Sequence, residues 1–173
     1  SSPPAEWRKI AASPFDLRRQ AMRLIEREIA NSTPDRPGRI IAKMNSLSDE
    51  KMIRLLHKAA DAGVEIDLIV RGICCYKPRA GQENVRIISI VDRYLEHSRL
   101  FYFFNNGDEE YYLSSADWMY RNLDKRVELL FPIEDEKIRG ILMRLLEFQL
   151  NDTDKLRRLQ ASGSYTRSMA EHY

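Results

Sequence analysis

The sequence contains very little cysteine, and its two cysteines are adjacent. Cys74 and Cys75 follow one another directly, and neighbouring residues in an ordinary backbone rarely reach disulfide geometry. No third cysteine is available for pairing, and the spacing matches no common zinc motif. We therefore expect a reducing, cytoplasmic environment in which both side chains are buried as small apolar groups.

The chain also lacks a large net charge and a long apolar run. Its 28 Lys and Arg residues nearly balance 26 Asp and Glu residues, which gives a net charge of +2. A basic surface for nucleic acid is therefore not expected, and any anion site must be a local cluster. No apolar run approaches the roughly 20 residues that span a bilayer, and no signal peptide is recognisable. The sequence starts without Met, which predicts either a trimmed chain or a segment of a longer protein.

The overall amino-acid composition is that of a folded domain. Apolar residues make up 43% and charged residues 31% of the 173 residues, enough for one domain with a hydrophobic core. An irregular entry segment is predicted over residues 1–16. Apolar residues at helical spacing then predict a helix from Leu17 to Ile29, with Asp16 as its N-cap.

The next part of the chain predicts a strand, a helix and a second strand. Residues 39–44 form a short apolar run, and residues 64–70 form another. Between them, Ser46 or Ser48 is expected to cap a helix with an apolar stripe, which ends at Gly63. Such a unit predicts two parallel strands joined by a right-handed crossover.

A parallel pair of strands brings both of its carboxyl ends to the same edge of the sheet, where ligands of open α/β sheets bind. Lys43 lies at the end of the first strand, and Arg71 and Gly72 follow the second. An arginine can bind phosphate through two hydrogen bonds, and a glycine lets a ligand approach the backbone. The sequence thus predicts a phosphate site at this edge.

The second half of the chain predicts further strands and a long helix. Asn105-Asn-Gly-Asp108 separates two apolar runs and predicts a hairpin. The other elements expected from the patterns are strands over 85–90 and 125–131, an amphipathic helix over 134–150 and a final short helix over 152–160. The fold class is therefore α/β, with helices flanking a mixed β-sheet.

Histidine is the side chain best suited to carry a proton or a phosphoryl group near neutral pH. His172 lies in a polar tail and is expected to be inert. His57 lies beside Lys58 in the helix between the two parallel strands and is expected at the surface. His97 begins a strand of the hairpin, close to Arg99. A histidine in such a place is more often structural than catalytic, so its position alone leaves a function as the less common alternative.

Two short segments resemble the motif of the phospholipase D superfamily. Glu96-His-Ser-Arg99 is similar to its histidine segment, with Arg99 where the motif has Lys. Ser114-Ser-Ala-Asp117 is similar to its small-residue segment, and Phe104 stands where the motif has Asp. These departures argue against phosphodiester hydrolysis.

Longer segments resemble the C-terminal catalytic domain of the large bacterial polyphosphate kinase family. They are Ala42-Lys-Met-Asn-Ser-Leu-Ser-Asp49, Leu68-Ile-Val-Arg-Gly-Ile-Cys-Cys75, Ser89-Ile-Val-Asp-Arg-Tyr-Leu-Glu-His97 and Tyr112-Leu-Ser-Ser-Ala-Asp-Trp-Met119. The resemblance implies that residues 17–150 are the second of two phospholipase D-like catalytic domains, followed by a C-terminal helix and polar tail over 151–173.

The family resemblance implies reversible transfer of the terminal phosphate of ATP to inorganic polyphosphate, with Mg²⁺ as a cofactor. It implies that Arg71 and His97 contact ATP, with His97 acting in catalysis. The phosphorylated histidine and the magnesium-linked arginines would lie upstream of this chain. The implied partners are ATP and ADP, polyphosphate, the remainder of the parent chain and further copies in a homo-oligomer. Peripheral attachment of the full enzyme to the inner membrane is left open.

Three basic residues, Lys43, Arg99 and Arg121, are further candidates for lining a polyphosphate path, although structural ion pairs explain each of them equally well. Two other functions remain open from the sequence. One is a phospholipase D-like phosphodiesterase, which would need a second copy of the histidine motif. The other is a non-catalytic module that binds polyanions.

Overall fold

The computed structural model describes residues 11–12, 15–89, 99–114, 118 and 129–161. The chain divides into two compact units, residues 1–133 and residues 134–173. The first unit contains the β-sheet and two helices, and the second contains one long helix.

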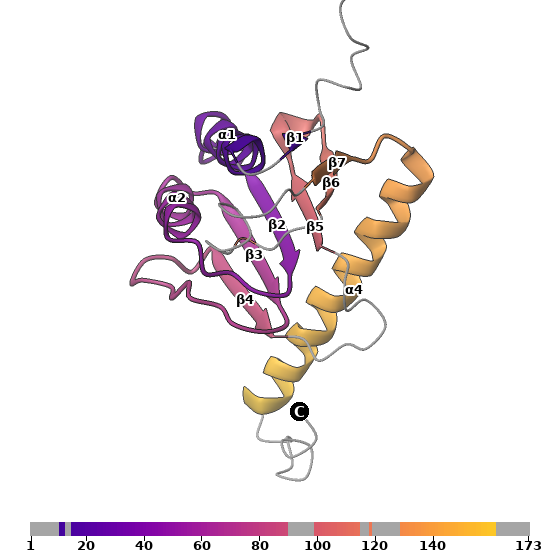
Figure 1. Cartoon of the computed structure of the whole chain (residues 1–173). Helices are drawn as coiled ribbons and strands as arrows, with labels where there is room; N and C mark the ends of the chain where they lie inside the picture. Colours follow the sequence, from indigo (N-terminus) through magenta and orange to yellow (C-terminus); the bar gives the residue numbers. More distant parts are fainter. Residues whose placement is uncertain (1–10, 13–14, 90–98, 115–117, 119–128, 162–173) are drawn as a thin grey trace, which may run out of the picture. The chain divides into compact units, whose positions relative to one another are not determined.

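The first unit is built on a seven-stranded mixed sheet (Figure 1). Its strands are β1 (Ala11–Ala12), β2 (Arg39–Met44), β3 (Glu65–Val70), β4 (Val85–Ser89), β5 (Arg99–Phe103), β6 (Glu110–Ser114) and β7 (Leu129–Pro132). The spatial order is β1-β7-β6-β5-β2-β3-β4. Strands β2, β3 and β4 are parallel, and all other pairings are antiparallel. The central strand β2 therefore joins a parallel half to an antiparallel half.

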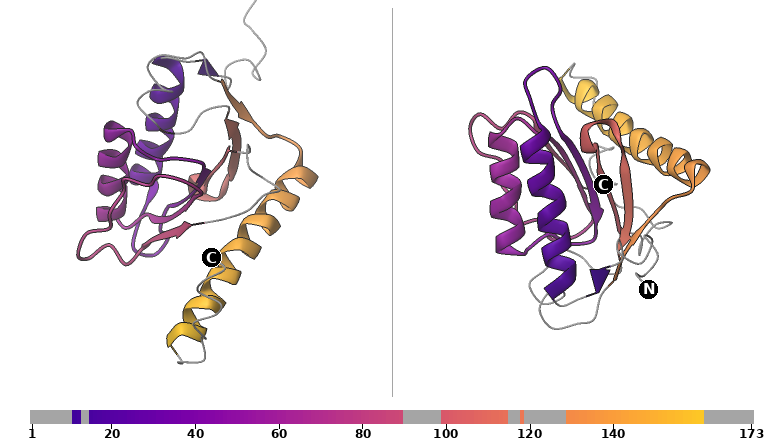
Figure 2. Two further views of the ribbon diagram at one scale, coloured as in Figure 1. Left: turned by 60° about the horizontal axis from the view of Figure 1, so that its bottom comes forward. Right: turned by 90° about the horizontal axis from the view of Figure 1, so that it is seen from above.

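Helices α1 (Phe15–Asn31) and α2 (Glu50–Asp61) lie side by side over one face of the sheet, as Figures 1 and 2 show. Apolar side chains of both helices pack with alternate residues of the strands in one core. The members of this core with no exposed surface include Ile25, Ile40, Ala42, Met52, Leu56 and Leu68. Ile41 and Ile69 are also fully buried, and alternation along the strands places them on the other face of the sheet.

The predicted strand–helix–strand unit is confirmed, with β2 and β3 in parallel register and α2 between them. The predicted hairpin is confirmed as β5 and β6, joined at Asn105–Gly107, where all three residues have positive φ. Glycine and asparagine tolerate this left-handed region better than other residues do, which is why the turn was readable from the sequence.

Both predicted helix caps are wrong. Helix α1 begins at Phe15, so Asp16 lies inside it. Helix α2 is capped by Asp49, whose carboxylate accepts a hydrogen bond from the backbone nitrogen of Met52 at 2.9 Å. Ser46 and Ser48 instead belong to the loop between β2 and α2. The C-terminal prediction was correct, since Gly63 follows the last turn with φ of 86°.

The expectation that His57 lies on the surface is also wrong. Its side chain is 6% exposed and stacks on Tyr76, with ring centroids 4.1 Å apart. The buried face of α2 is wide because the loop after β3 folds back over the helix and covers His57. The expectation for the cysteines is only half met, because Cys75 is exposed and Cys74 is partly buried.

The second unit contains helix α4 (Glu136–Ala161), one continuous helix where the sequence predicted a helix over 134–150 and a separate short one. Asp135 precedes its first turn and accepts hydrogen bonds from the backbone nitrogens of Lys137 and Ile138. Four large apolar side chains of α4 are exposed: Ile138, Ile141, Leu145 and Phe148. Within the part of the chain that the structure describes, no helix has the length and apolarity needed to cross a membrane.

Candidate functional site

The strand directions bring several sequence-distant segments to one edge of the sheet. The carboxyl ends of β2, β3 and β4 lie there, together with the start of β5 and the end of β6. We call this edge the carboxyl edge, formed by residues 43–49, residues 71–76, Arg99, Ser114 and Trp118. It is the edge at which the sequence predicted a phosphate site.

Two loops of the carboxyl edge are tied together through their backbones. The nitrogen of Gly72 donates to the oxygen of Asn45 at 2.6 Å, and the nitrogen of Leu47 donates to the oxygen of Ile73 at 2.8 Å. The nitrogen of Cys75 donates back to the oxygen of Leu47 at 2.8 Å. The loop that carries Arg71 is therefore held in register with the loop that leads into α2.

Gly72 is needed for this contact. A Cβ atom added at this position would lie 2.9 Å from the backbone oxygen of Asn45 and 3.2 Å from the hydroxyl of Ser46. The sequence predicted that the glycine allows a ligand to approach the backbone. In the structure the approaching group is the neighbouring loop. Gly72 therefore lets the segments that follow β2 and β3 stay in contact beyond the ends of the two strands.

Trp118 fixes the other side of the loop before α2. Its backbone oxygen accepts hydrogen bonds from the nitrogens of Ser48 and Asp49 at 2.9 and 2.8 Å. Its side chain is 1% exposed and stacks on Phe101, with ring centroids 4.7 Å apart. Asp49 is further held by Arg18 of α1 through a 2.7 Å ion pair. Sequence reasoning did not predict these contacts, because they join segments far apart in the chain.

Three of the five predicted site residues lie within the described part of this edge. Arg71 is exposed, and its backbone nitrogen donates to the oxygen of Met44 at 3.2 Å. Lys43 is buried at 8% exposure and lies opposite Leu100, on the face away from α1 and α2. Arg99 lies opposite Ser114 and shares the helix-covered face with Phe101. The edge thus carries basic groups on both faces of the sheet.

The other two predicted residues, His97 and Arg121, lie outside the described residues. His97 precedes the first residue of β5 by two positions in the sequence.

The described part of the carboxyl edge favours anions. Its one carboxylate, Asp49, is 1% exposed and is engaged by Arg18 and by the nitrogen of Met52. Among the described residues no group of three His, Cys, Asp or Glu side chains could hold a metal ion. Cys74 is not an activated thiol, since burial raises its pKa. Among the described residues of the edge, Arg71 is the exposed charged group, and an exposed guanidinium suits a phosphate ligand.

A buried hydrogen-bond network holds the far end of the loop that carries Arg71. The side-chain oxygen of Gln82 accepts from the Tyr76 hydroxyl at 2.7 Å and lies 3.2 Å from Nδ1 of His57. The side-chain nitrogen of Gln82 donates to Asp61 at 2.9 Å. Burial raises the pKa of Tyr76 to about 12, so its hydroxyl stays protonated and remains a donor. The network attaches this loop to α2.

Comparisons with known proteins agree on one family. The sequence profile of the polyphosphate kinase C-terminal domain 2 family matches residues 10–172. A polyphosphate kinase of Thermosynechococcus vestitus is 49% identical over 162 residues. The crystal structure of polyphosphate kinase from Porphyromonas gingivalis matches 82% of this chain with a TM-score of 0.77 and 45% identity.

Proteins with much lower sequence identity share the fold. Nuc from Salmonella typhimurium, described as a phospholipase D family member, matches 82% of this chain and 92% of its own chain, with a TM-score of 0.56 at 13% identity. The predicted phospholipase D-like α/β fold is therefore confirmed. The matched region is 92% of this chain but 22% of the Thermosynechococcus protein, and the Porphyromonas structure is likewise covered over 22% of its length.

Proposed function

Because the chain belongs to the polyphosphate kinase C-terminal domain family, we propose that it binds ATP and phosphate groups at its carboxyl edge as part of a polyphosphate kinase. The whole reaction would be reversible transfer of the terminal phosphate of ATP to inorganic polyphosphate. The observation that carries the proposal is the position of Arg71, exposed at the carboxyl edge with Lys43 and Arg99 at the same edge.

Phosphoryl transfer needs positioning and charge neutralisation more than it needs many covalent groups. In the proposed site, the guanidinium of Arg71 forms two hydrogen bonds to a phosphate of ATP. His97 donates a hydrogen bond or a proton to the oxygen of the transferring or departing phosphate. Lys43, Arg99 and Arg121 line the path of the polyphosphate chain and offset its negative charge.

Magnesium is expected with ATP from the family resemblance. The described residues do not fit a protein-held magnesium ion, because Asp49 is already engaged and the remaining charged groups of the edge are basic. No step of the proposed mechanism passes through the ion. The remainder of the parent chain, a homo-oligomeric full enzyme and a cytoplasmic location belong to the same proposal.

The test is a calorimetric titration of this chain with ATP. We expect Arg71→Ala to weaken ATP binding about tenfold or more, because the loss of charge-assisted hydrogen bonds to phosphate costs roughly 1.5–3 kcal/mol. The matched control is Arg36→Ala, which removes an exposed arginine from the loop at the opposite edge of the sheet. Equal affinity of Arg71→Ala and the parent chain would remove Arg71 from the site.

A further inference from the structure

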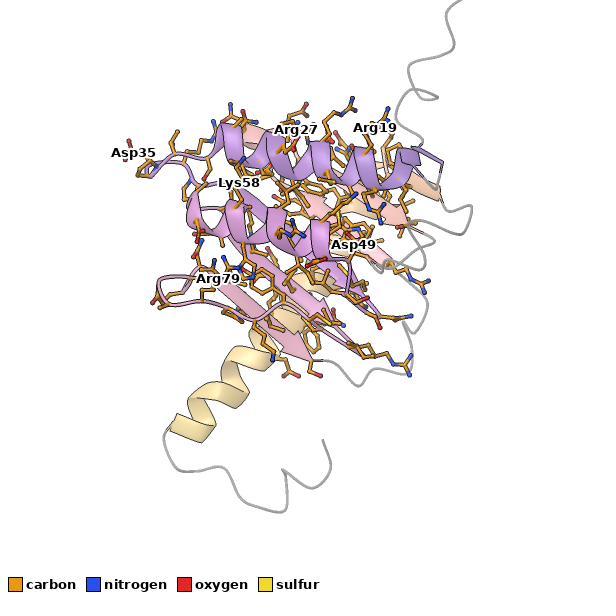
Figure 3. The ribbon with its side chains drawn as sticks, turned by 60° about the vertical axis from the view of Figure 1, so that its left-hand side comes forward. Arg19, Arg27, Asp35, Asp49, Lys58 and Arg79 are labelled. Atoms are coloured by element: carbon orange, nitrogen blue, oxygen red, sulfur yellow. The ribbon has the colours of Figure 1, made fainter. Side chains whose placement is uncertain are left out.

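The outer surfaces of α1 and α2 carry two rows of basic side chains. Arg19 and Arg23 are exposed on α1, and Lys51, Arg54 and Lys58 are exposed on α2. We call these five residues the basic face. The two helices lie side by side on the sheet, so both rows point away from the core (Figure 3, where Arg19 and Lys58 are labelled). None of these residues belongs to the carboxyl edge.

The basic face begins beside the carboxyl edge. Arg18, next to Arg19, forms an ion pair with Asp49, the N-cap of α2, so both helices start at this edge. Glu28, near the other end of α1, contacts the backbone of Arg39 at the opposite edge. Arg19 and Lys51 therefore lie near the proposed phosphate site. Lys51 and Lys58, seven residues apart on a helix, extend the row by about 10 Å away from it.

The spacing of these charges is unfavourable for the helices themselves. Arg19 and Arg23 are four residues apart, as are Arg54 and Lys58, and like charges at this spacing repel. Lys51 also lies in the first turn of α2, where a positive charge opposes the helix dipole. These spacings gather positive charge on the outer surface of each helix, and such a concentration of charge attracts an anionic ligand.

Carboxylates of the same helices neutralise the basic face only in part. Among the described residues, the one ion pair of the basic face joins Arg54 to Glu50 at 3.4 Å, between side chains 71% and 83% exposed. Such an exposed pair contributes little. Among the residues of these helices whose exposure is described, the other exposed acidic residues are Glu26 and Asp61, and Asp61 already accepts a hydrogen bond from Gln82.

The basic face is charged but not apolar, which narrows the class of ligand that it can bind. Every exposed large apolar side chain in the described part of the chain lies outside α1 and α2. A membrane-binding helix inserts such side chains into lipid, and single-stranded RNA usually stacks its bases on aromatic rings. A ligand held here would be recognised by charge alone, through a repeating phosphate backbone that carries no bases.

We propose that the basic face is a docking surface for the extended part of a polyphosphate chain whose end lies at the carboxyl edge. The proposal rests on the proposed function, since that function supplies the polyphosphate. A longer chain covers more of the basic face and gains more ion pairs. ATP and tripolyphosphate are too short to extend along both helical rows, so they depend on the carboxyl edge.

The test compares the binding of long-chain polyphosphate, tripolyphosphate and ATP to the 173-residue chain. Two double variants, Arg19→Gln/Arg23→Gln and Lys51→Gln/Lys58→Gln, each remove two charges from the basic face. We expect each to bind long polyphosphate about tenfold more weakly, to lower the slope of log affinity against log salt by roughly 1 per charge, and to leave ATP binding unchanged. The variants should unfold at the same or a higher temperature, since like-charge repulsion is relieved.

The matched control is Lys137→Gln/Arg144→Gln, which removes two exposed charges from α4. Parental affinity for long polyphosphate in both basic-face variants would overturn the proposal, as would an equal loss in the control. Tighter binding of oligo-RNA or anionic phosphatidylglycerol vesicles at the same residues would assign the surface to another ligand and also overturn it. If Arg71→Ala leaves ATP binding intact while the basic-face variants lose polyphosphate, the proposed ATP site fails and the docking surface stands.

Discussion

Glu28 is a buried carboxylate that holds two backbone segments at the end of the sheet opposite the proposed site. One of its oxygens accepts from the nitrogen of Asn105 at 2.5 Å, and the other accepts from the nitrogen of Arg39 at 3.1 Å. The residue has no exposed surface. Burial raises its pKa above 4.5 despite these hydrogen bonds, so its charged form carries a desolvation cost.

Substituting this residue is expected to change how stability depends on pH. Between pH 4.5 and the raised pKa, the folded state binds more protons at Glu28 than the unfolded state, so stability falls as pH rises through this window. The slope is at most about 1.4 kcal/mol per pH unit. Glu28→Gln resembles the protonated acid and should lose this slope. Urea denaturation at several pH values would measure the difference between parent and variant.

The control for this comparison is Glu26→Gln, which changes an exposed glutamate on the same helix. Its stability should follow the parent chain at every pH. If the stability of the parent relative to the Glu28→Gln variant stays constant or grows as pH rises, the slope does not come from Glu28.

Single residues were predictable from the sequence where local chemistry determines them. Arg71 follows a buried strand directly, so its exposure at the carboxyl edge could be expected, and the structure places it there. The burial of His57 could not be expected, because it depends on Tyr76 and Gln82, about twenty residues further along the chain. For the same reason the contact of Trp118 with the loop before α2 could not be predicted, because it is made through the backbone oxygen of Trp118.

At the scale of elements, the close contact at Gly72 between the segments that follow β2 and β3 is the feature that supports the proposed site. Gly72→Ala should lower the free energy of unfolding by about 1–3 kcal/mol, because the added methyl group meets the backbone of Asn45 and the two loops must separate. ATP affinity should fall with it, since Arg71 is the adjacent residue. Urea denaturation followed by circular dichroism, together with calorimetry, would measure both effects.

The same substitution at Gly140 is the control. Gly140 lies in α4, and a Cβ atom there would meet nothing within 4 Å. Gly140→Ala should therefore leave stability unchanged or raise it by up to about 1 kcal/mol, through the higher helix propensity of alanine. If Gly72→Ala leaves the free energy of unfolding and the ATP affinity unchanged, the two loops can accommodate a methyl group and their register is not important for the edge.

Most elements were readable from the sequence, and those that were not have physical reasons. The apolar runs of β2 and β3 and the Asn-Asn-Gly turn are strong local signals, and both led to correct predictions. The two-residue strand β1 has no sequence signature, because only its pairing with β7 defines it. The length of α4 was underestimated because its apolar pattern weakens after Leu150, although polar helix-forming residues continue the helix.

At the scale of the whole molecule, the chain corresponds to about a fifth of the relatives that it matches. The family resemblance implies that the phosphorylated histidine lies upstream of this chain. We therefore expect no sustained transfer of phosphate from ATP to polyphosphate by the 173-residue chain, even where it binds both. A steady-state assay of polyphosphate formation, with a full-length family member as the positive control, would test this. Turnover comparable to that enzyme would contradict the assignment.

The family could be predicted from the sequence, but not from periodicity or composition. Those patterns led to an α/β domain with an anion site, which many proteins share. The family came from four longer segments, three of which end at or run past the carboxyl ends of β2, β3 and β6. The opposite edge, with Glu28 and the β5–β6 turn, contributed none of them.

The central place of β2 also has a consequence for how the chain folds. Its pairing with β3 closes over a short crossover, whereas its pairing with β5 joins residues about sixty positions apart, such as Ile40 and Phe103. Closing that long interval costs more chain entropy than forming the local crossover or the β5–β6 hairpin. The two locally formed halves should therefore assemble early, and their docking along β2 should limit the rate of folding.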